Sequence, residues 1–149
     1  MNNIAYLVPA IAVAALIVAF GLSSWIGKVD EGTGTMVEIA GHIRDGAMAF
    51  LKREYKTMAI VVVVVFVAIG FALDNWVTAG LYVVGAVFSI LAGFLGMNVA
   101  TKGNVRTAHA AETGMGKALN VAFRSGAVMG LCVSGLGMLG LGLTLCLFD

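Results

Sequence analysis

The side chains in this sequence that could do chemistry are a few acids, bases and histidines in two polar stretches. Metal-assisted hydrolysis needs carboxylates gathered around magnesium, with Lys or Arg to hold an anionic substrate. The acids that could serve are Asp30, Glu31, Glu38, Asp45, Glu54 and Glu112. They are scattered among bases, and no two of them share a helix face at close spacing. We therefore expect a solvated helix face with local ion pairs, and no catalytic residue in this chain.

The histidines and cysteines do not form a metal-binding motif either. His42 and His109 stand alone, and no histidine lies near Cys132 or Cys146. On one helix the two cysteines would be roughly 21 Å apart, whereas the Cα atoms of a disulfide lie within about 7 Å. Both cysteines are expected to pack as small apolar residues, and no metal or cofactor is expected to bind this chain itself.

The composition indicates a membrane protein. Of the 149 residues, 60% are apolar and only 11% are charged, and the mean hydropathy is +1.00. Soluble domains carry about 25% charged residues, so a soluble fold of this size could not hide so much apolar surface. The lipid bilayer is therefore the expected partner, and a net charge of +1 gives no reason to expect nucleic acid.

Four charge-free stretches are long enough to cross roughly 30 Å of hydrocarbon. The predicted spans cover residues 3–27, 57–73, 77–100 and 125–148, with polar segments at 28–56 and 101–124. The first stretch has no basic residue before Lys28, so it is interpreted as a retained transmembrane helix and not as a signal peptide. The predicted fold class is an all-α membrane protein with four transmembrane helices and long cytoplasmic helix extensions.

The basic residues predict the orientation of these spans. All nine Lys and Arg residues lie in the two polar segments, and none lies at either terminus or in the turn at Asp74 and Asn75. Because basic loops stay in the cytoplasm, both polar segments are expected to be cytoplasmic and both termini outside. The expected location is an integral position in a prokaryotic plasma membrane.

The first polar segment is expected to be mostly helical. Gly32, Thr33 and Gly34 interrupt the chain, and Thr35 with Glu38 forms a capping-box pattern. Apolar residues then recur every three or four positions, with no proline or glycine pair before the second span. One long helix is therefore predicted from Thr35 through that span. In the second polar segment, residues 104–113 are expected to be helical as well.

The spans contain small residues but no ionisable side chain. Gly126 and Gly130 form a GxxxG pair, and such spacing lets helices approach closely in lipid. Each of the few polar residues is expected to bond a carbonyl one turn back; they are Ser89, Asn98, Ser134 and Thr144. Ion pathways through membranes are marked by ionisable residues, so this chain alone is not expected to move ions.

Three motifs resemble one known family. They are IRDGAMAFLKREYK at residues 43–56, GFLGMNVATKGNVRTA at 93–108 and AFRSGAVMGL at 122–131. Together they are similar to the membrane-bound, ion-translocating inorganic pyrophosphatases, which are pyrophosphate-energised proton or sodium pumps. The resemblance covers essentially the whole chain, as the N-terminal portion of such a pump.

The resemblance implies a homodimer of sixteen-helix subunits, in which these four helices belong to an outer ring. An inner ring would hold pyrophosphate, magnesium and the ion gate, and potassium would be a second candidate cation. The family's aspartate-rich catalytic stretches have no counterpart here, so no catalytic, cofactor-binding or metal-binding residue is expected in this chain. The positions that match the family as helix-extension and loop residues are Arg44, Asp45, Arg53, Glu54, Asn104, Arg106 and Arg124. They are expected to brace helix ends against the remaining helices of the pump.

Two other functions were weighed against a pump fragment. A stand-alone four-helix scaffold, or a partner subunit without catalytic activity, would also need no intramembrane charge. Small four-helix drug exporters need a carboxylate inside the membrane, and the four spans contain none. The leading hypothesis is therefore an N-terminal fragment of a pump that couples pyrophosphate hydrolysis to proton or sodium translocation, inactive on its own.

Overall fold

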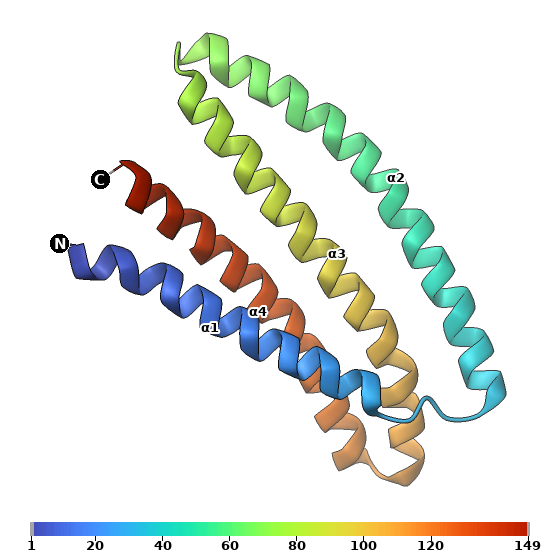
Figure 1. The fold of residues 1–149 in the computed structure, drawn as a ribbon. Helices are drawn as coiled ribbons and strands as arrows, with labels where there is room; N and C mark the ends of the chain where they lie inside the picture. The colour runs from blue at the N-terminus through green and yellow to red at the C-terminus, as the bar shows by residue number, and fades with distance from the viewer. Residues whose placement is uncertain (1, 149) are drawn as a thin grey trace.

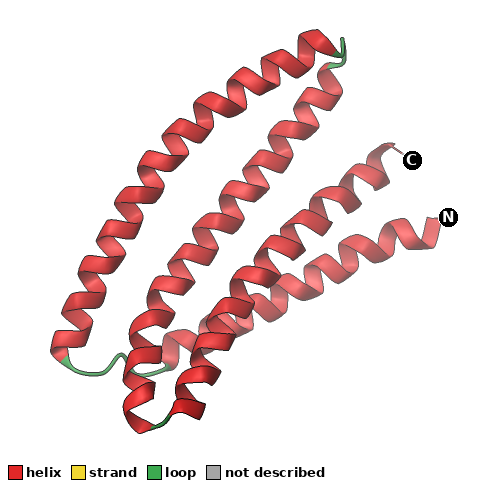
Figure 2. Ribbon diagram, turned by 180° about the vertical axis from the view of Figure 1, so that it is seen from behind, coloured by secondary structure: helices red, strands yellow, loops and turns green. Residues whose placement is uncertain are grey.

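The computed structural model describes residues 2–148, and these residues form four helices in a row (Figure 1). Helix α1 spans Asn2–Lys28, α2 spans Gly34–Ala72, α3 spans Trp76–Thr113 and α4 spans Met115–Phe148. No strand occurs in the part of the chain described, and only short connections join the helices (Figure 2). All four helices are long and apolar enough to cross a membrane. The all-α, four-helix prediction is confirmed.

Helix α2 is continuous through the first polar segment and the second apolar stretch, as predicted. Its 39 residues make it about 58 Å long at 1.5 Å per residue, well beyond the thickness of a hydrocarbon core. The predicted capping box was wrong, because the N-cap is Thr33 and its side chain makes no capping hydrogen bond. Helix α3 likewise runs on to Thr113, which confirms the helix expected over 104–113.

A tight turn joins α2 to α3. The side chain of Asn75 caps α3 by accepting hydrogen bonds from the backbone nitrogens of Val77 and Thr78, at 3.0 and 3.2 Å. Trp76 folds back onto α2, where a Cβ added at Gly70 would lie 2.7 Å from the indole ring. The glycine at position 70 is therefore what lets the first residue of α3 pack against α2.

The four helices do not pack evenly. Helix α4 packs along both α1 and α3, whereas α2 contacts only α3. The buried core lies where α1, α3 and α4 meet, and it consists of Ala19, Ile26, Val99, Val128 and Cys132. Cys132 is thus a small core residue, as expected. The N- and C-terminal ends and the α2–α3 turn lie at one end of the molecule, and the other two connections lie at the opposite end (Figure 1).

Glycines set the close approach of α4 to its neighbours. A Cβ at Gly96 would lie 2.8 Å from the Met129 side chain, and one at Gly103 would collide with Ser125. By contrast, a Cβ at Gly126 or Gly130 would have no neighbour within 4 Å among the described residues. The GxxxG pair therefore faces away from α1 and α3 and leaves a surface on which another helix could approach closely.

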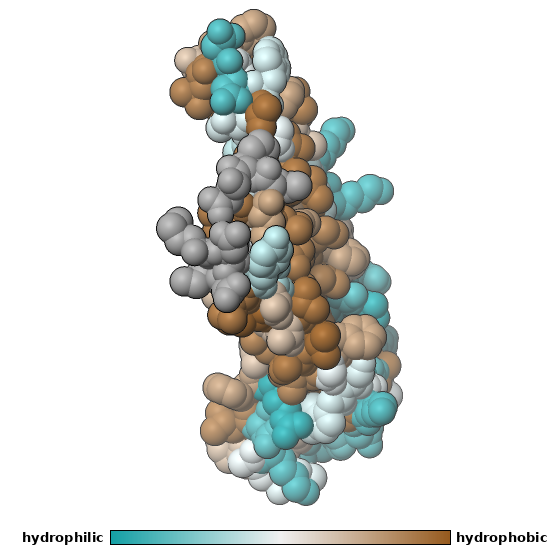
Figure 3. Space-filling model, turned by 60° about the vertical axis from the view of Figure 1, so that its left-hand side comes forward, coloured by the Kyte–Doolittle hydropathy of each residue, from teal (hydrophilic) through white to brown (hydrophobic). Residues whose placement is uncertain are grey.

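Most apolar side chains point outward. Hydrophobic residues cover the middle of the face seen in Figure 3, and hydrophilic residues gather at its ends and along one edge. On α2, the side chains of Ile60, Val63 and Val64 are each more than 60% exposed. This surface would be unstable in water and is suited to lipid or to further helices.

The polar residues of the apolar stretches behave differently from one another. Thr144 donates to the carbonyl of Gly140 at 2.9 Å, one turn back, as expected. For Asn98 the expectation was wrong, because its side chain donates to no carbonyl among the described residues, and its buried Oδ1 atom also lacks a hydrogen-bond partner there. An unpaired buried carbonyl is costly, so Asn98 is a point of local instability within the four helices.

Candidate functional site

Arg106 is the most highly connected charged residue described in the structure. Its side chain is only 6% exposed. Nε donates to the carbonyl of Val29 at 2.9 Å, Nη1 to the carbonyl of Lys102 at 2.8 Å, and Nη2 to Glu31 Oε1 at 2.6 Å. The guanidinium therefore ties the chain that leaves α1 to the side of α3. Charge-assisted bonds of this kind are shorter and stronger than neutral ones.

The segment between α1 and α2 follows a path fixed by Gly32. This glycine has a φ of +88°, which a residue with a side chain rarely adopts. Its backbone nitrogen donates to Asp30 Oδ1 at 3.0 Å, and a Cβ there would lie 2.6 Å from Met36 Sδ and 2.9 Å from His109 Cγ. The segment thus runs too close to α3 for any other residue to fit without a shift.

His109 contacts two carboxylates, in keeping with the local ion pairs expected of the polar segments. Its Nδ1 lies 3.2 Å from Glu112 Oε2, and its Nε2 lies 3.8 Å from Asp30 Oδ2. These side chains extend the contact between α3 and the α1–α2 segment that Arg106 begins. No group of three or more His, Cys, Asp or Glu suited to a metal ion occurs among the described residues.

Arg124 and Trp25 connect α4 to α1. The guanidinium carbon lies 4.1 Å from the centroid of the indole ring, a distance that gives a cation–π attraction. We call the end of the molecule formed by residues 29–33 and 101–124 the basic end. Arg106 and Arg124 hold its three elements together, one through hydrogen bonds and the other through ring stacking.

The structure brings together only some of the residues that match the family. Arg44 lines a small pocket of about 160 Å³ together with Glu31 and Arg106, and Arg124 lies at the basic end. The others are exposed and form no ion pair with a described residue; they are Asp45, Arg53, Glu54 and Asn104. Arg106 and Arg124 thus contact other parts of the four helices, and bracing against the remaining helices of the pump stays a prediction.

The partners of Arg106 could not be found from the sequence. Glu31 lies 75 positions before Arg106, and nothing in local spacing pairs them. The contact between His109 and Glu112 could have been predicted from the sequence, because residues three apart on a helix are neighbours. The stacking of Arg124 on Trp25 depends on how α1 and α4 cross, which no local pattern encodes.

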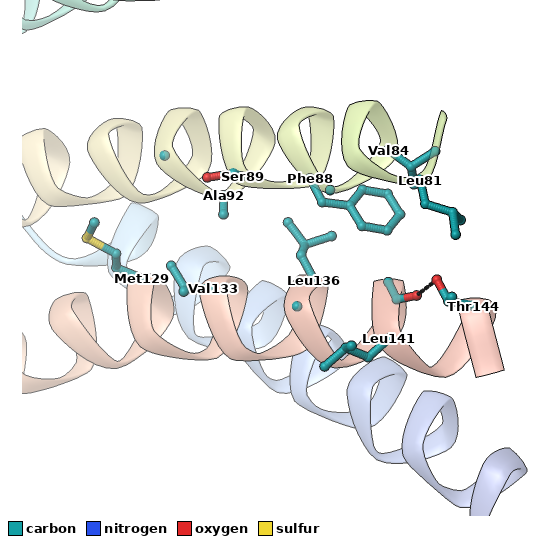
Figure 4. Close-up of a pocket in the computed structure, with 14 residues that line it drawn as sticks. Leu81, Val84, Phe88, Ser89, Ala92, Met129, Val133, Leu136, Leu141 and Thr144 are labelled. Carbon is teal, nitrogen blue, oxygen red and sulfur yellow. Dashed lines mark hydrogen bonds between the residues drawn. The ribbon is translucent and has the colours of Figure 1, made fainter. Parts of the chain in front are cut away.

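A second hollow lies between α3 and α4, toward the end with the chain termini (Figure 4). Its volume is about 570 Å³. Phe88 on α3 and Met129, Val133 and Leu136 on α4 lie along it, and no ionisable side chain lines it. Such a groove cannot bind a phosphate or carry out proton transfer, but it can take an apolar helix or lipid.

The fold and these two regions define an integral membrane helical module, with charge at one end and packing glycines along its length. A model of the inorganic H+ pyrophosphatase family matches residues 13–149. The chain therefore belongs to that family.

Curated relatives agree with this assignment. The chain is 60% identical over 121 residues to a proposed K(+)-stimulated pyrophosphate-energized sodium pump of Clostridium tetani, covering 80% of this chain and 18% of the relative. It is 42% identical over 142 residues to a K(+)-insensitive pyrophosphate-energized proton pump of Methanosarcina mazei, covering 94% and 21%.

A third relative is the K(+)-stimulated pyrophosphate-energized sodium pump of Thermotoga maritima, at 39% identity over 145 residues, covering 96% of this chain and 19% of the relative. The chain thus spans about a fifth of the length of these relatives. The similarity extends to pumps whose names give different ions and different responses to potassium.

Replacing Arg106 tests its role as the anchor of the basic end. Arg106→Met keeps much of the side-chain length but leaves the Val29 carbonyl without its donor and Glu31 without its cation, whereas the Lys102 carbonyl keeps its helix partner, the backbone N–H of residue 106. Each unsatisfied buried acceptor costs about 1–3 kcal/mol, so thermal unfolding in detergent should shift to lower temperature. The matched control is Arg53→Met, at an exposed arginine that forms no ion pair with a described residue. Equal shifts in the two variants would contradict the anchor role.

Proposed function

We propose that this chain forms the N-terminal, outer-ring part of a pump that couples pyrophosphate hydrolysis to proton or sodium translocation. Its own role is to position the remaining helices, and it supplies no catalytic group. The observation that carries this proposal is the α3–α4 groove, an apolar hollow lined by packing glycines in a chain of this family. A hollow of this kind is where a further transmembrane helix can pack.

The distribution of charge supports a structural role for this chain and a catalytic role for the other helices of the pump. Magnesium held between carboxylates and pyrophosphate is the chemistry expected of the whole pump, yet no metal-binding group occurs among the described residues. In this proposal magnesium, and potassium where it is needed, bind to helices outside this chain. The homodimer expected of the family is likewise formed by the whole pump.

Reconstituting the whole pump that contains this chain tests the proposal. Gly137→Ile places a large side chain in the groove at a position where no described atom lies within 4 Å of an added Cβ. It should leave the four helices intact but lower pyrophosphate hydrolysis and pyrophosphate-driven ion uptake into liposomes. The matched control is Gly21→Ile on α1, which also has no described neighbour within 4 Å and lies outside the groove.

Two results would contradict the proposal. Wild-type protein that shows no magnesium-dependent pyrophosphate hydrolysis would remove the pump assignment and favour a stand-alone scaffold. Equal activity in Gly137→Ile and wild-type protein would show that no helix occupies the groove.

We also propose that the basic end faces the cytoplasm of a prokaryotic cell, with both termini outside. All nine Lys and Arg residues lie within residues 28–56 and 101–124, the two segments that border the α1–α2 and α3–α4 connections, and basic loops are retained on the cytoplasmic side. In a variant with Cys132 and Cys146 replaced by serine, a cysteine at Asp74 should react with an impermeant maleimide added to intact cells, and one at Lys117 should not. The reverse labelling would overturn this orientation.

A further inference from the structure

A cavity of about 500 Å³ opens at the basic end, where α1 and α3 end and α4 begins. It is distinct from the apolar groove between α3 and α4. Its lining includes Trp25, Arg106, His109, Lys117, Asn120 and Arg124. Three of these side chains are permanently charged, and all three are cationic. No carboxylate lines the cavity.

The positive charge of two of these residues is not neutralised within the four helices. Arg106 is paired with Glu31, at 2.6 Å. Lys117 and Arg124 take part in no ion pair with a described residue. The cavity therefore has a net positive lining, and a low-dielectric wall beside such charges strengthens their attraction for an anion.

Hydrogen-bond donors at this site are also unused. Arg124 contacts the Trp25 ring at 4.1 Å, but its N–H groups make no hydrogen bond to a described residue, and neither do the ammonium of Lys117 and the amide of Asn120. Stacking on the indole restrains the guanidinium without using its N–H groups. A planar fork with free N–H groups suits the oxygens of a phosphate.

The position of the cavity indicates what kind of molecule would carry that phosphate. Trp25 and Arg124 lie where the long apolar stretches of α1 and α4 meet their polar ends, the level at which tryptophans and headgroups are found. An adjoining hollow of about 390 Å³ shares Gly116, Asn120 and Arg124 and is lined by Phe123 and Leu119, which are 75% and 66% exposed. Charged and apolar surfaces thus lie side by side, as an amphipathic ligand requires.

We propose that this cavity binds the phosphate headgroup of an anionic phospholipid, with Lys117 and Arg124 as its ligands. Basic pockets between transmembrane helices at a membrane surface are suited to such headgroups. The bound lipid neutralises the two unpaired cations and fills the space between the ends of α1, α3 and α4. This requires only that the helices cross a membrane, and it does not depend on pump activity.

Native mass spectrometry of the complete membrane protein, delipidated and titrated with phosphatidylglycerol or phosphatidylcholine, tests the proposal. Lys117→Gln with Arg124→Gln should weaken phosphatidylglycerol binding roughly tenfold or more, because each cation near the surface contributes to the attraction. The matched control is Lys52→Gln with Arg53→Gln, which removes one lysine and one arginine charge from exposed positions on α2. It should leave the affinity for the most tightly bound phosphatidylglycerol unchanged.

Two single variants and a competition with inorganic phosphate test the lipid site independently of the double variant. Asn120→Asp adds a carboxylate to the cavity at almost unchanged volume, and Lys117→Gln removes one exposed charge; each should reduce phosphatidylglycerol binding even if the double variant fails to fold. Inorganic phosphate at millimolar concentration should not displace the lipid. Equal losses in the two double variants, unchanged binding in Asn120→Asp, or displacement by free phosphate would each overturn it, the last in favour of a soluble phosphate ligand.

Discussion

The three hydrogen bonds of Arg106 are the contact on which the arrangement of the basic end depends. They join α3 to the segment that leads from α1 into α2, whereas α1 and α3 otherwise touch little and α2 touches α3 alone. Because the guanidinium is buried, its loss would leave the Val29 carbonyl unsatisfied as well as remove an ion pair. The path of the segment that leads into α2 therefore depends on Arg106 together with the backbone conformation of Gly32.

The rest of the bundle obeys the constraints of a lipid environment. Apolar side chains gain little by packing on each other instead of on lipid, so close backbone approach at Gly96 and Gly103 replaces the hydrophobic driving force between helices. The same reasoning explains why Gly126 and Gly130 can remain unpaired within this chain. Their surface, the α3–α4 groove and the outward face of α2 are all suited to helices that the four described here do not include.

Much of this fold follows from the sequence, because membrane helices are specified locally by length and hydropathy. The continuous α2 and the extension of α3 to Thr113 were predictable for this reason. The start of α2 was not, because Thr35 and Glu38 match a capping pattern while the chain direction set by Gly32 makes Thr33 the N-cap. The contacts of Arg106, His109 and Arg124 were also missed, since they arise from helices that meet only in three dimensions.

The most direct test is to measure magnesium-dependent pyrophosphatase activity in two samples. One is the purified 1–149 chain, and the other is the same chain co-expressed with the remaining helices of the pump. The comparison tests whether this segment positions the other helices and does no chemistry itself. The charge-free apolar stretches and the scattered carboxylates predict no hydrolysis by the chain alone, and hydrolysis when both parts are present. Magnesium-dependent hydrolysis of pyrophosphate by the 1–149 chain alone would contradict this division of labour.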